Sequence, residues 1–594
     1  MKQQIISALK KALGELGVSG VEPVVEAPGE SSHGDYSTNV ALNLKSQIVN
    51  LKSATQKLKP GKSPIELAQQ IVKILNTKYQ ILNTDRIEAV VPGFINFWLS
   101  KEFLISQLSK EATPLRPSSS VGSKVMVEFT DPNPFKEFHI GHLYSNIVGE
   151  SLCRLLEAEG AEVKRANYQG DVGMHIAKAL YALLQISNLS SKGGSASGGK
   201  SQTSNVQKQD VKTRVEFLGE AYALGAKAYE EDEAAKKEIN ELNKKIYEKD
   251  PDVMGVYNKG RQWSLDYFES IYKRLGTKFD FYYFESEVGE IGLKLVKEYL
   301  EKGVFEESEG AVIFPGKQFG LHTRVFINSL GLPTYEAKEL GLAPTKYQDF
   351  AYDQSLIITG NEIIEYFKVL LSALAKIRPD LALKTKHIPH GMVRLAQGKM
   401  SSRTGNIITG PWLLDEAKAK IKEKFGDITE EVAEQVAVGA VKYALLKSSI
   451  GKDIAFSFEE SINLEGNSGP YIQYTYARTQ SVLAKVKTPH FAPLSGASRG
   501  KQNSKVNKLN SEELTLLRLL HHFPEVVGEA SQNFAPNLLC NYLFNLAQSF
   551  NLFYQKHQVI GSQQEAFRLA LTSAVGQTLN NGLYLLGIQA PERM

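Results

Sequence analysis

Short apolar runs alternate with helical spacing in the middle of the chain. The run K-V-M-V-E-F (124–129) predicts a strand. Beyond His142, apolar residues such as Leu143, Ile147 and Leu152 fall at the three-to-four-residue spacing of a helix, and V-K-R-A-N-Y predicts a second strand. This order of strand, helix and strand predicts a parallel sheet whose ligand binds at the carboxyl ends of its strands.

The two ends of the chain have different patterns. Residues 1–115 predict a small α+β domain, with a helix near Pro64–Asn76 and strands at Arg86–Val90 and Phe94–Leu99. From Thr429 onward, helical periodicity dominates. We therefore expect domains at 1–115, 116–395 and 429–594, a connection at 396–428, and an insertion near 187–260 in the middle domain.

Three segments depart from these patterns. Residues 187–205 are rich in serine and glycine, which predicts a flexible insertion. Residues 229–250 are highly charged and predict a solvated helix, with an RNA-contacting arm as the alternative. A basic, polar loop at 495–508 interrupts the C-terminal helices.

Composition narrows the class of protein. The chain has 594 residues, 42% of them hydrophobic and 23% charged, which is ordinary for a globular protein but too long for one core. A net charge of +4 means that any nucleic-acid contact must come from local basic patches. The distant Cys153 and Cys540 make a disulfide framework or thiolate zinc site improbable and favour a reducing cytosol. No signal peptide is evident, and no run of about eighteen apolar residues predicts a membrane span.

The first candidate site is D-P-N-P-F-K-E-F-H-I-G-H (131–142), between the predicted strand and helix. Its prolines predict an extended turn, and Gly141 lets the backbone approach a ligand where the helix begins. Histidine side chains and amides there suit a triphosphate. A zinc site on His139 and His142 is the alternative, but no third ligand is evident, so we expect no metal.

The second candidate site is G-K-M-S-S-R-T-G-N-I-I-T (398–409). Its cations would offset phosphate charge, and its small residues would let a loop close over a polyphosphate. Taken alone, the same segment fits a solvated turn equally well.

Together, in this order, the two segments resemble the two signatures of class I aminoacyl-tRNA synthetases. Further segments resemble the arginyl-tRNA synthetases in particular: V-E-F-T-D-P-N-P-F-K-E-F-H-I-G-H, R-A-N-Y-Q-G-D-V-G, P-T-Y-E-A-K-E-L-G, G-P-Y-I-Q-Y-T-Y-A-R and L-G-I-Q-A-P-E-R-M, with G-D-Y-S-T-N-V-A-L and P-G-F-I-N-F near the N-terminus. The resemblance covers nearly the entire chain except residues 187–205 and 495–508.

The resemblance implies a multidomain α/β fold: a Rossmann-like parallel-sheet catalytic domain, an α+β N-terminal domain that holds the tRNA elbow, and an all-α anticodon-binding domain. It implies that ATP, with Mg²⁺, activates L-arginine with release of pyrophosphate. The arginyl group then passes to the 2′-hydroxyl of the terminal adenosine of tRNA(Arg). It also implies that bound tRNA is needed for activation. We expect a cytoplasmic monomer that does not bind DNA or membranes.

The resemblance also implies residue roles. Catalytic roles fall to His139, His142, Lys136 and Lys399. ATP contacts fall to His139, Gly141, His142, Lys399, Ser401 and Arg403. Arginine contacts fall to Glu128, Asn133, Tyr335 and Glu339. Contacts with tRNA fall to Phe94, Asn96, Tyr474, Arg478 and Met594.

Two positions depart from the family pattern. Ser402 stands where the class has the second lysine of K-M-S-K-S, and Lys136 is expected to compensate. Glu339 stands where the family commonly has an aspartate that binds the guanidinium group, so the carboxylate lies one methylene further out.

Some roles have simpler alternatives. Glu128 could pair with Lys124 or Lys136, Tyr335 could pack in a core, and Asn133 could be a turn residue. Phe94 and Asn96 fit strand core and turn equally well. Tyr474 and Arg478, one helical turn apart, suit a tRNA surface or an exposed helix face.

Three functions other than that of an arginyl-tRNA synthetase fit parts of the sequence. Another class I synthetase, such as one for cysteine, would be expected to carry zinc-binding thiolates. A small-molecule cytidylyltransferase with H-x-G-H would not account for the helical C-terminal third. A catalytically silent tRNA-binding paralogue is disfavoured because His139, His142, Lys136 and Lys399 are all present.

Overall fold

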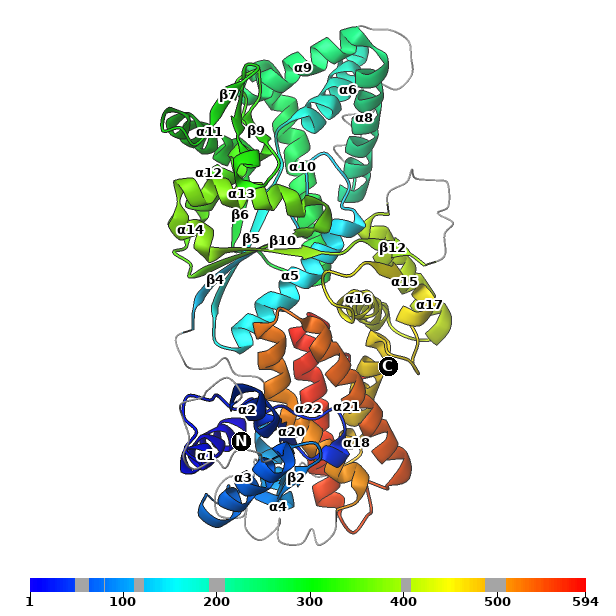
Figure 1. Ribbon diagram of the computed structural model, residues 1–594. Helices are drawn as coiled ribbons and strands as arrows, with labels where there is room; N and C mark the ends of the chain where they lie inside the picture. Colours follow the sequence, from blue (N-terminus) through cyan, green and yellow to red (C-terminus); the bar gives the residue numbers. More distant parts are fainter. Residues whose placement is uncertain (49–62, 80, 112–121, 192–208, 397–407, 487–508) are drawn as a thin grey trace. The chain divides into compact units, whose positions relative to one another are not determined.

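The computed structural model describes residues 1–48, 63–79, 81–111, 122–191, 209–396, 408–486 and 509–594 (Figure 1). The chain divides into two compact units. The first comprises Met1–Pro114, Thr475–Val526 and Asn545–Leu579; the second comprises Leu115–Tyr474, Val527–Phe544 and Asn580–Met594. The C-terminal helices therefore contribute to both units.

The second unit is built on a five-stranded parallel sheet of order β11-β10-β4-β5-β6. Its strands are β4 (Lys124–Glu128), β5 (Glu162–Gln169), β6 (Phe281–Phe284), β10 (Gln354–Gly360) and β11 (Thr385–His390). The first strand in sequence, β4, is central, and the strand order reverses between β4 and β10. Rossmann-like sheets bind ligands at this reversal, beyond the carboxyl ends of the strands.

Helices cover this sheet and extend beyond it (Figure 1). They are α5 (Ile140–Ala158), α6 (Met174–Ser191), α10 (Pro251–Leu275), α11 (Glu285–Glu301), α12 (Tyr335–Asp349), α13 (Ile364–Ile377) and α14 (Pro379–Lys384). A small antiparallel sheet of β7 (Glu306–Ser308), β8 (Ala311–Phe314) and β9 (Arg324–Ile327) shares a core with α12 and α13. Short 3-10 helices lie at Ser31–His33, Gly316–Phe319 and Asn361–Ile363.

The described residues of the expected insertion are mostly helical. Helices α8 (Val211–Glu231) and α9 (Glu233–Tyr247) share a core with α6 and α10. The charged segment near 229–250 forms the amphipathic α9, which buries Ile239, Leu242 and Ile246 and exposes its charges, as a solvated helix should. Residues 187–191 of the predicted flexible insertion are instead helical, because α6 continues to Ser191, and residues 192–205 lie outside the described residues.

The N-terminal part of the first unit is α+β. It contains α1 (Lys2–Glu15), β1 (Tyr36–Thr38), α2 (Val40–Ile48), α3 (Pro64–Lys78), β2 (Thr84–Val90), β3 (Phe94–Leu99) and α4 (Lys101–Glu111). The strands form an antiparallel sheet of order β1-β3-β2. Asp35 pairs with Arg518 at 2.8 Å, and the Tyr36 hydroxyl donates to Glu525 at 2.6 Å. Asp35 and Tyr36 of the segment G-D-Y-S-T-N thus hold the N-terminal α+β part against a C-terminal helix of the same unit.

The last third of the chain is mostly helical. Its helices are α15 (Gly410–Phe425), α16 (Glu430–Leu446), α17 (Phe458–Ser461), α18 (Gly469–Ala484), α20 (Ser511–Gln532), α21 (Pro536–Lys556) and α22 (Glu565–Leu585). One short strand, β13 (Ile454–Phe456), interrupts them and pairs with β12 (Val393–Leu395). The sequence pattern missed β13, because a three-residue strand has no readable period. The segment 495–508 lies outside the described residues.

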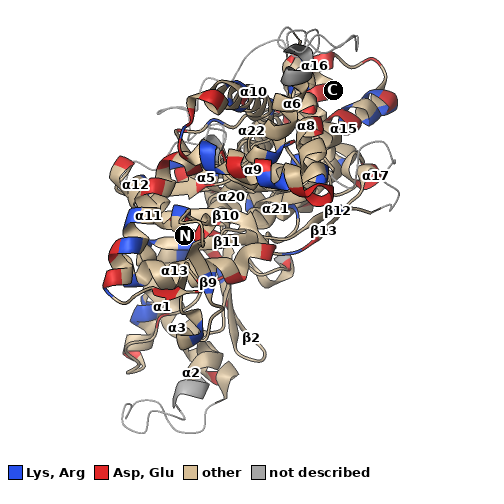
Figure 2. Ribbon diagram, turned by 90° about the horizontal axis from the view of Figure 1, so that it is seen from above, with Lys and Arg blue, Asp and Glu red and all other residues tan. Residues whose placement is uncertain are grey.

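Surface charge is mixed, as the small net charge predicts. Figure 2 shows basic and acidic residues side by side along helices such as α9 and α15. Within the described ranges, no helix combines the length and apolar character needed to cross a membrane.

Candidate active site

The two histidines of H-I-G-H form the cap of α5 where the strand order reverses. Nδ1 of His139 accepts hydrogen bonds from the backbone N–H groups of Gly141 (3.1 Å) and His142 (3.4 Å). In return, Nδ1 of His142 accepts from the backbone N–H of His139 at 3.2 Å. The rings stack with centroids 3.5 Å apart. Each imidazole thus replaces the polar side chain that usually caps a helix.

This cap fixes the tautomer of both rings. A neutral imidazole that accepts at Nδ1 carries its proton on Nε2. Burial, followed by the charge of Lys136, lowers the pKa of His139 to about 4. Burial, followed by the adjacent His139, lowers the pKa of His142 well below its ordinary value. Both rings are therefore neutral Nε2–H donors at the positive end of a helix, which suits a phosphate.

The turn before the cap is not the extended turn that its prolines predicted. Thr130, Asp131 and Phe135 have φ values of 81°, 45° and 67°, in the left-handed region. Hydrogen bonds hold the strained backbone: the N–H of Thr130 donates to Ser145 Oγ at 2.9 Å, and Asn146 donates to Thr130 Oγ1 at 3.0 Å. Non-glycine residues adopt this conformation where the surroundings enforce it, often at functional sites.

The end of the second signature lies beside this cap. Lys399, Ser401, Ser402 and Arg403 fall outside the described residues, but their C-terminal flank does not. The N–H of Ile140 donates to the carbonyl of Ile408 at 2.9 Å, and the N–H of Gly410 donates to the carbonyl of Phe138 at 2.7 Å. Two segments about 260 residues apart in sequence therefore meet at the start of α5.

Acidic residues gather next to the end of β4. Glu128 and Lys346 form an ion pair of 2.5 Å in which both side chains are almost fully buried. The alternative that Glu128 pairs with Lys124 or Lys136 is wrong, because its partner is Lys346. Burial, followed by the charge of Glu128, raises the pKa of both Asp131 and Glu339 well above the usual range. An excess of carboxylates around one buried lysine favours a cationic ligand.

Glu339 is placed to meet such a ligand. It lies on α12 and is half-buried. No hydrogen bond or ion pair engages it in the described part of the chain. The neighbouring Lys338 forms a buried ion pair of 2.6 Å with Glu285 instead.

Asn133 and Tyr335 both lie near Glu285. A Cβ added at Gly170 would lie 2.3 Å from Asn133 Oδ1 and 3.2 Å from Glu285, so this glycine is what allows Asn133 its position. Tyr335 begins α12 and is 57% exposed, which contradicts the alternative that it packs in a core. Both side chains are available to a ligand.

Several residues that hold the site together were not predicted from the sequence. Asp171, fully buried, accepts from the N–H and hydroxyl of Ser286, from Tyr257 and from Arg261 at 2.8–3.1 Å. These bonds join the end of β5 to α10 and α11. Asp171 belongs to R-A-N-Y-Q-G-D-V-G, so its place in that motif was the only signal.

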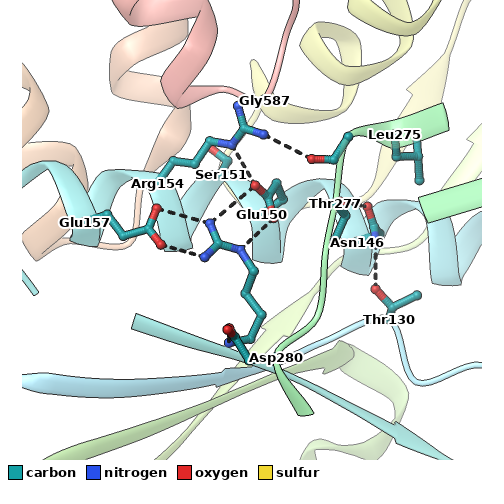
Figure 3. Close-up of polar contacts among 12 residues, drawn as sticks. Thr130, Asn146, Glu150, Ser151, Arg154, Glu157, Leu275, Thr277, Asp280 and Gly587 are labelled. Atoms are coloured by element: carbon teal, nitrogen blue, oxygen red, sulfur yellow. Dashed lines mark hydrogen bonds and ion pairs between the residues drawn. The ribbon is translucent and has the colours of Figure 1, made fainter. Parts of the chain in front are cut away.

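A second polar network ties α5 to the end of the chain (Figure 3). Glu150 accepts from Arg154 at 2.7 Å and from Arg165 at 2.9 Å. Arg154 also donates to the carbonyl of Tyr584 at 2.9 Å. The buried Lys442 donates to the carbonyls of Leu275 at 2.6 Å and Gly587 at 2.5 Å. The helix that carries the histidines is therefore anchored at its far end.

The residues expected to contact tRNA are divided between the two units: Phe94, Asn96 and Arg478 belong to the first, and Tyr474 and Met594 to the second. Phe94 is 38% exposed on β3, whereas Asn96 is buried and accepts from Ser37 at 2.7 Å. Tyr474 and Arg478 both lie on α18 and are half-buried, and Arg478 donates to Asn551 at 2.5 Å. The chain-terminal Met594 is half-buried.

The sheet order, the histidine cap and the return of residues 408–410 to that cap define a class I aminoacyl-tRNA synthetase. The family model described as "tRNA synthetases class I (R), catalytic domain" matches residues 104–458. The DALR anticodon binding domain matches residues 472–594, and the arginyl tRNA synthetase N terminal domain matches residues 1–99. The chain belongs to the arginyl-tRNA synthetase family.

Individual relatives agree with this assignment. The chain is 32% identical over 542 residues to the arginine–tRNA ligase of Flavobacterium psychrophilum, covering 87% of this chain and 88% of the relative. It is 31% identical to that of Borreliella burgdorferi, covering 93% and 96%. The arginyl-tRNA synthetase structure from Thermus thermophilus superimposes with a TM-score of 0.78 at 25% identity, with all of both chains covered. These matches favour this family over another class I synthetase or a cytidylyltransferase.

Proposed function

We propose that this chain joins L-arginine to tRNA(Arg) in two steps that use ATP. The observation that carries the proposal is the position of the neutral histidine pair. It caps α5 at the edge of the sheet where the carboxylates around Glu339 also lie. One edge thus offers donors for a triphosphate and an acidic pocket for a guanidinium group.

In the first step, a carboxylate oxygen of arginine attacks the α-phosphorus of ATP. The new bond joins that oxygen to phosphorus, and the bond to the β-phosphate oxygen breaks, releasing pyrophosphate. The Nε2–H groups of His139 and His142 donate to the transferring phosphate, and the ammonium group of Lys136 offsets its charge. Lys399, Ser401 and Arg403 would hold the other phosphates.

Mg²⁺ would enter with ATP. In the described ranges, no group of three His, Cys, Asp or Glu side chains could hold a metal ion. Phosphate oxygens and water are its usual partners when a protein offers few ligands. Its contribution would be to neutralise the charge of the leaving pyrophosphate.

The acidic pocket would select arginine. Glu339 would pair with the guanidinium group, while Asn133, Tyr335 and the oxygen of Glu128 that Lys346 does not engage would orient the rest of the amino acid. A pocket that bonds a polar side chain rejects analogues that lack it by roughly 10⁴–10⁵. No editing domain is then required.

In the second step, the 2′-hydroxyl of the terminal adenosine attacks the arginyl carbonyl and AMP leaves. Phe94 and Asn96 would contact the tRNA elbow, and Tyr474, Arg478 and Met594 would contact its anticodon arm. The domain limits given above, a monomeric state and a cytoplasmic location belong to the same proposal.

Arginine-dependent exchange between ATP and labelled pyrophosphate tests the proposal. Wild type and His142→Ala should be assayed with and without tRNA(Arg). Exchange that requires tRNA and falls by about 10²–10³ in the variant would support it, since one lost transition-state donor has about that effect. Folded protein that binds tRNA(Arg) but gives no exchange would point to the silent paralogue.

A further inference from the structure

Helix α10 holds the backbone next to Lys136. Phe135 is fully buried against α10, where a Cβ added at Gly260 would lie 2.3 Å from its ring. The backbone N–H of Phe135 donates to Ser264 Oγ on the same helix at 2.9 Å. The position of Lys136 therefore depends on helices outside the parallel sheet.

The side chain of Lys136 has an aromatic partner. Its Nζ lies 5.1 Å from the centre of the Tyr222 ring on α8, within the range of a cation–π interaction. Among the residues that the structure describes, no carboxylate lies within ion-pair distance of this ammonium group. The cation is thus oriented without being neutralised.

The charge of Lys136 reaches the histidine cap. Lys136 precedes His139 by three residues, and its charge lowers the pKa of both His139 and His142. Burial, followed by the charge of Lys178, lowers the pKa of Lys136 itself. An isolated, partly desolvated cation beside two phosphate donors is strongly attracted to a polyphosphate.

We propose that Tyr222 is a positioning residue that holds the ammonium group of Lys136 beside the phosphates of ATP. This inference rests on the proposed function. An aromatic ring suits the task better than a carboxylate, because its quadrupole directs the ammonium group and leaves the full positive charge for the phosphate. The inserted helix α8 thereby takes part in arginine activation without touching substrate.

The test is arginine-dependent ATP–pyrophosphate exchange by the full chain with saturating tRNA(Arg). Tyr222→Leu should lower the exchange rate by about 3- to 30-fold, the range of a cation–π interaction. Tyr222→Phe keeps the ring and should restore most of the rate. Phe217→Leu is the matched control, because Phe217 lies on the same helix and packs against the same core.

A double-mutant cycle distinguishes the proposed positioning role of Tyr222 from a purely structural role. In a Lys136→Ala background, Tyr222→Leu should cause no further loss, because the interaction is already gone. An equal loss in both backgrounds, or equal losses in Tyr222→Leu and Phe217→Leu, would overturn the proposal. A wild-type chain that gives no exchange would overturn the proposed function as well, whereas an active wild type with an unaffected Tyr222→Leu would overturn only the role of Tyr222.

Discussion

Replacing Glu339 with glutamine should weaken arginine binding strongly. The carboxylate is half-buried, is unpaired within the described structure, and lies near Glu128 and Asp131. The charge of Lys346 lowers the pKa of Glu339 only in part. A guanidinium group would supply the missing partner, and glutamine would keep the shape of the side chain without its charge.

The magnitude follows from the kind of bond lost. A hydrogen bond to a charged group contributes about 1.5–3 kcal/mol, so Glu339→Gln should raise the KM for arginine roughly 10- to 150-fold. A pH dependence should accompany this change. Burial and the charge of Glu128 raise the pKa of Glu339, so arginine must displace a proton from this carboxyl group in order to pair with it. Arginine affinity should therefore rise with pH up to that raised pKa.

The assay is pyrophosphate exchange at saturating ATP and tRNA(Arg), with arginine varied at several values between about pH 6 and pH 8. The wild type should show a falling KM as the pH rises, and Glu339→Gln should lose most of that slope. Glu339→Asp keeps the charge and should keep the slope. A KM for Glu339→Gln within threefold of wild type, with the same slope, would refute the assignment and move the guanidinium site to Glu128 or Asp131.

Two further predictions concern buried lysines. Lys346→Met should destabilise the protein by roughly 3–5 kcal/mol, because it leaves Glu128 buried without its partner. Adding Glu128→Gln should restore much of the lost stability, measured by calorimetry of the full chain. An unchanged unfolding temperature in Lys346→Met would contradict this prediction. Burial lowers the pKa of Lys442 to about 7, so the unfolded chain binds more protons than the folded chain between about pH 7 and pH 10. The stability of wild type relative to Lys442→Met should therefore rise from about pH 7 to pH 9; a constant difference would show that the folded-state pKa is ordinary.

The predictions from the sequence were most accurate for features that depend on residues close together in the chain. The predicted strand Phe94–Leu99 matches β3, and the strand–helix–strand order around residues 124–169 gives the parallel sheet. The capping histidines are three residues apart, so their motif could be read without a fold. Glu128 and Asn133 could be named as candidates for the same reason.

Residues close together in the chain were therefore enough to indicate the family, the periodic elements and the side chains able to do the chemistry. The partner of each side chain, in contrast, depends on how the chain folds. Lys346 lies 218 residues from Glu128, and Gly587 lies 145 residues from Lys442. Tyr222 lies on an inserted helix with no sequence signal linking it to Lys136. The physical reason is that hydrogen bonds and ion pairs act over a few ångströms, and strand order and helix packing alone bring such distant residues within that range.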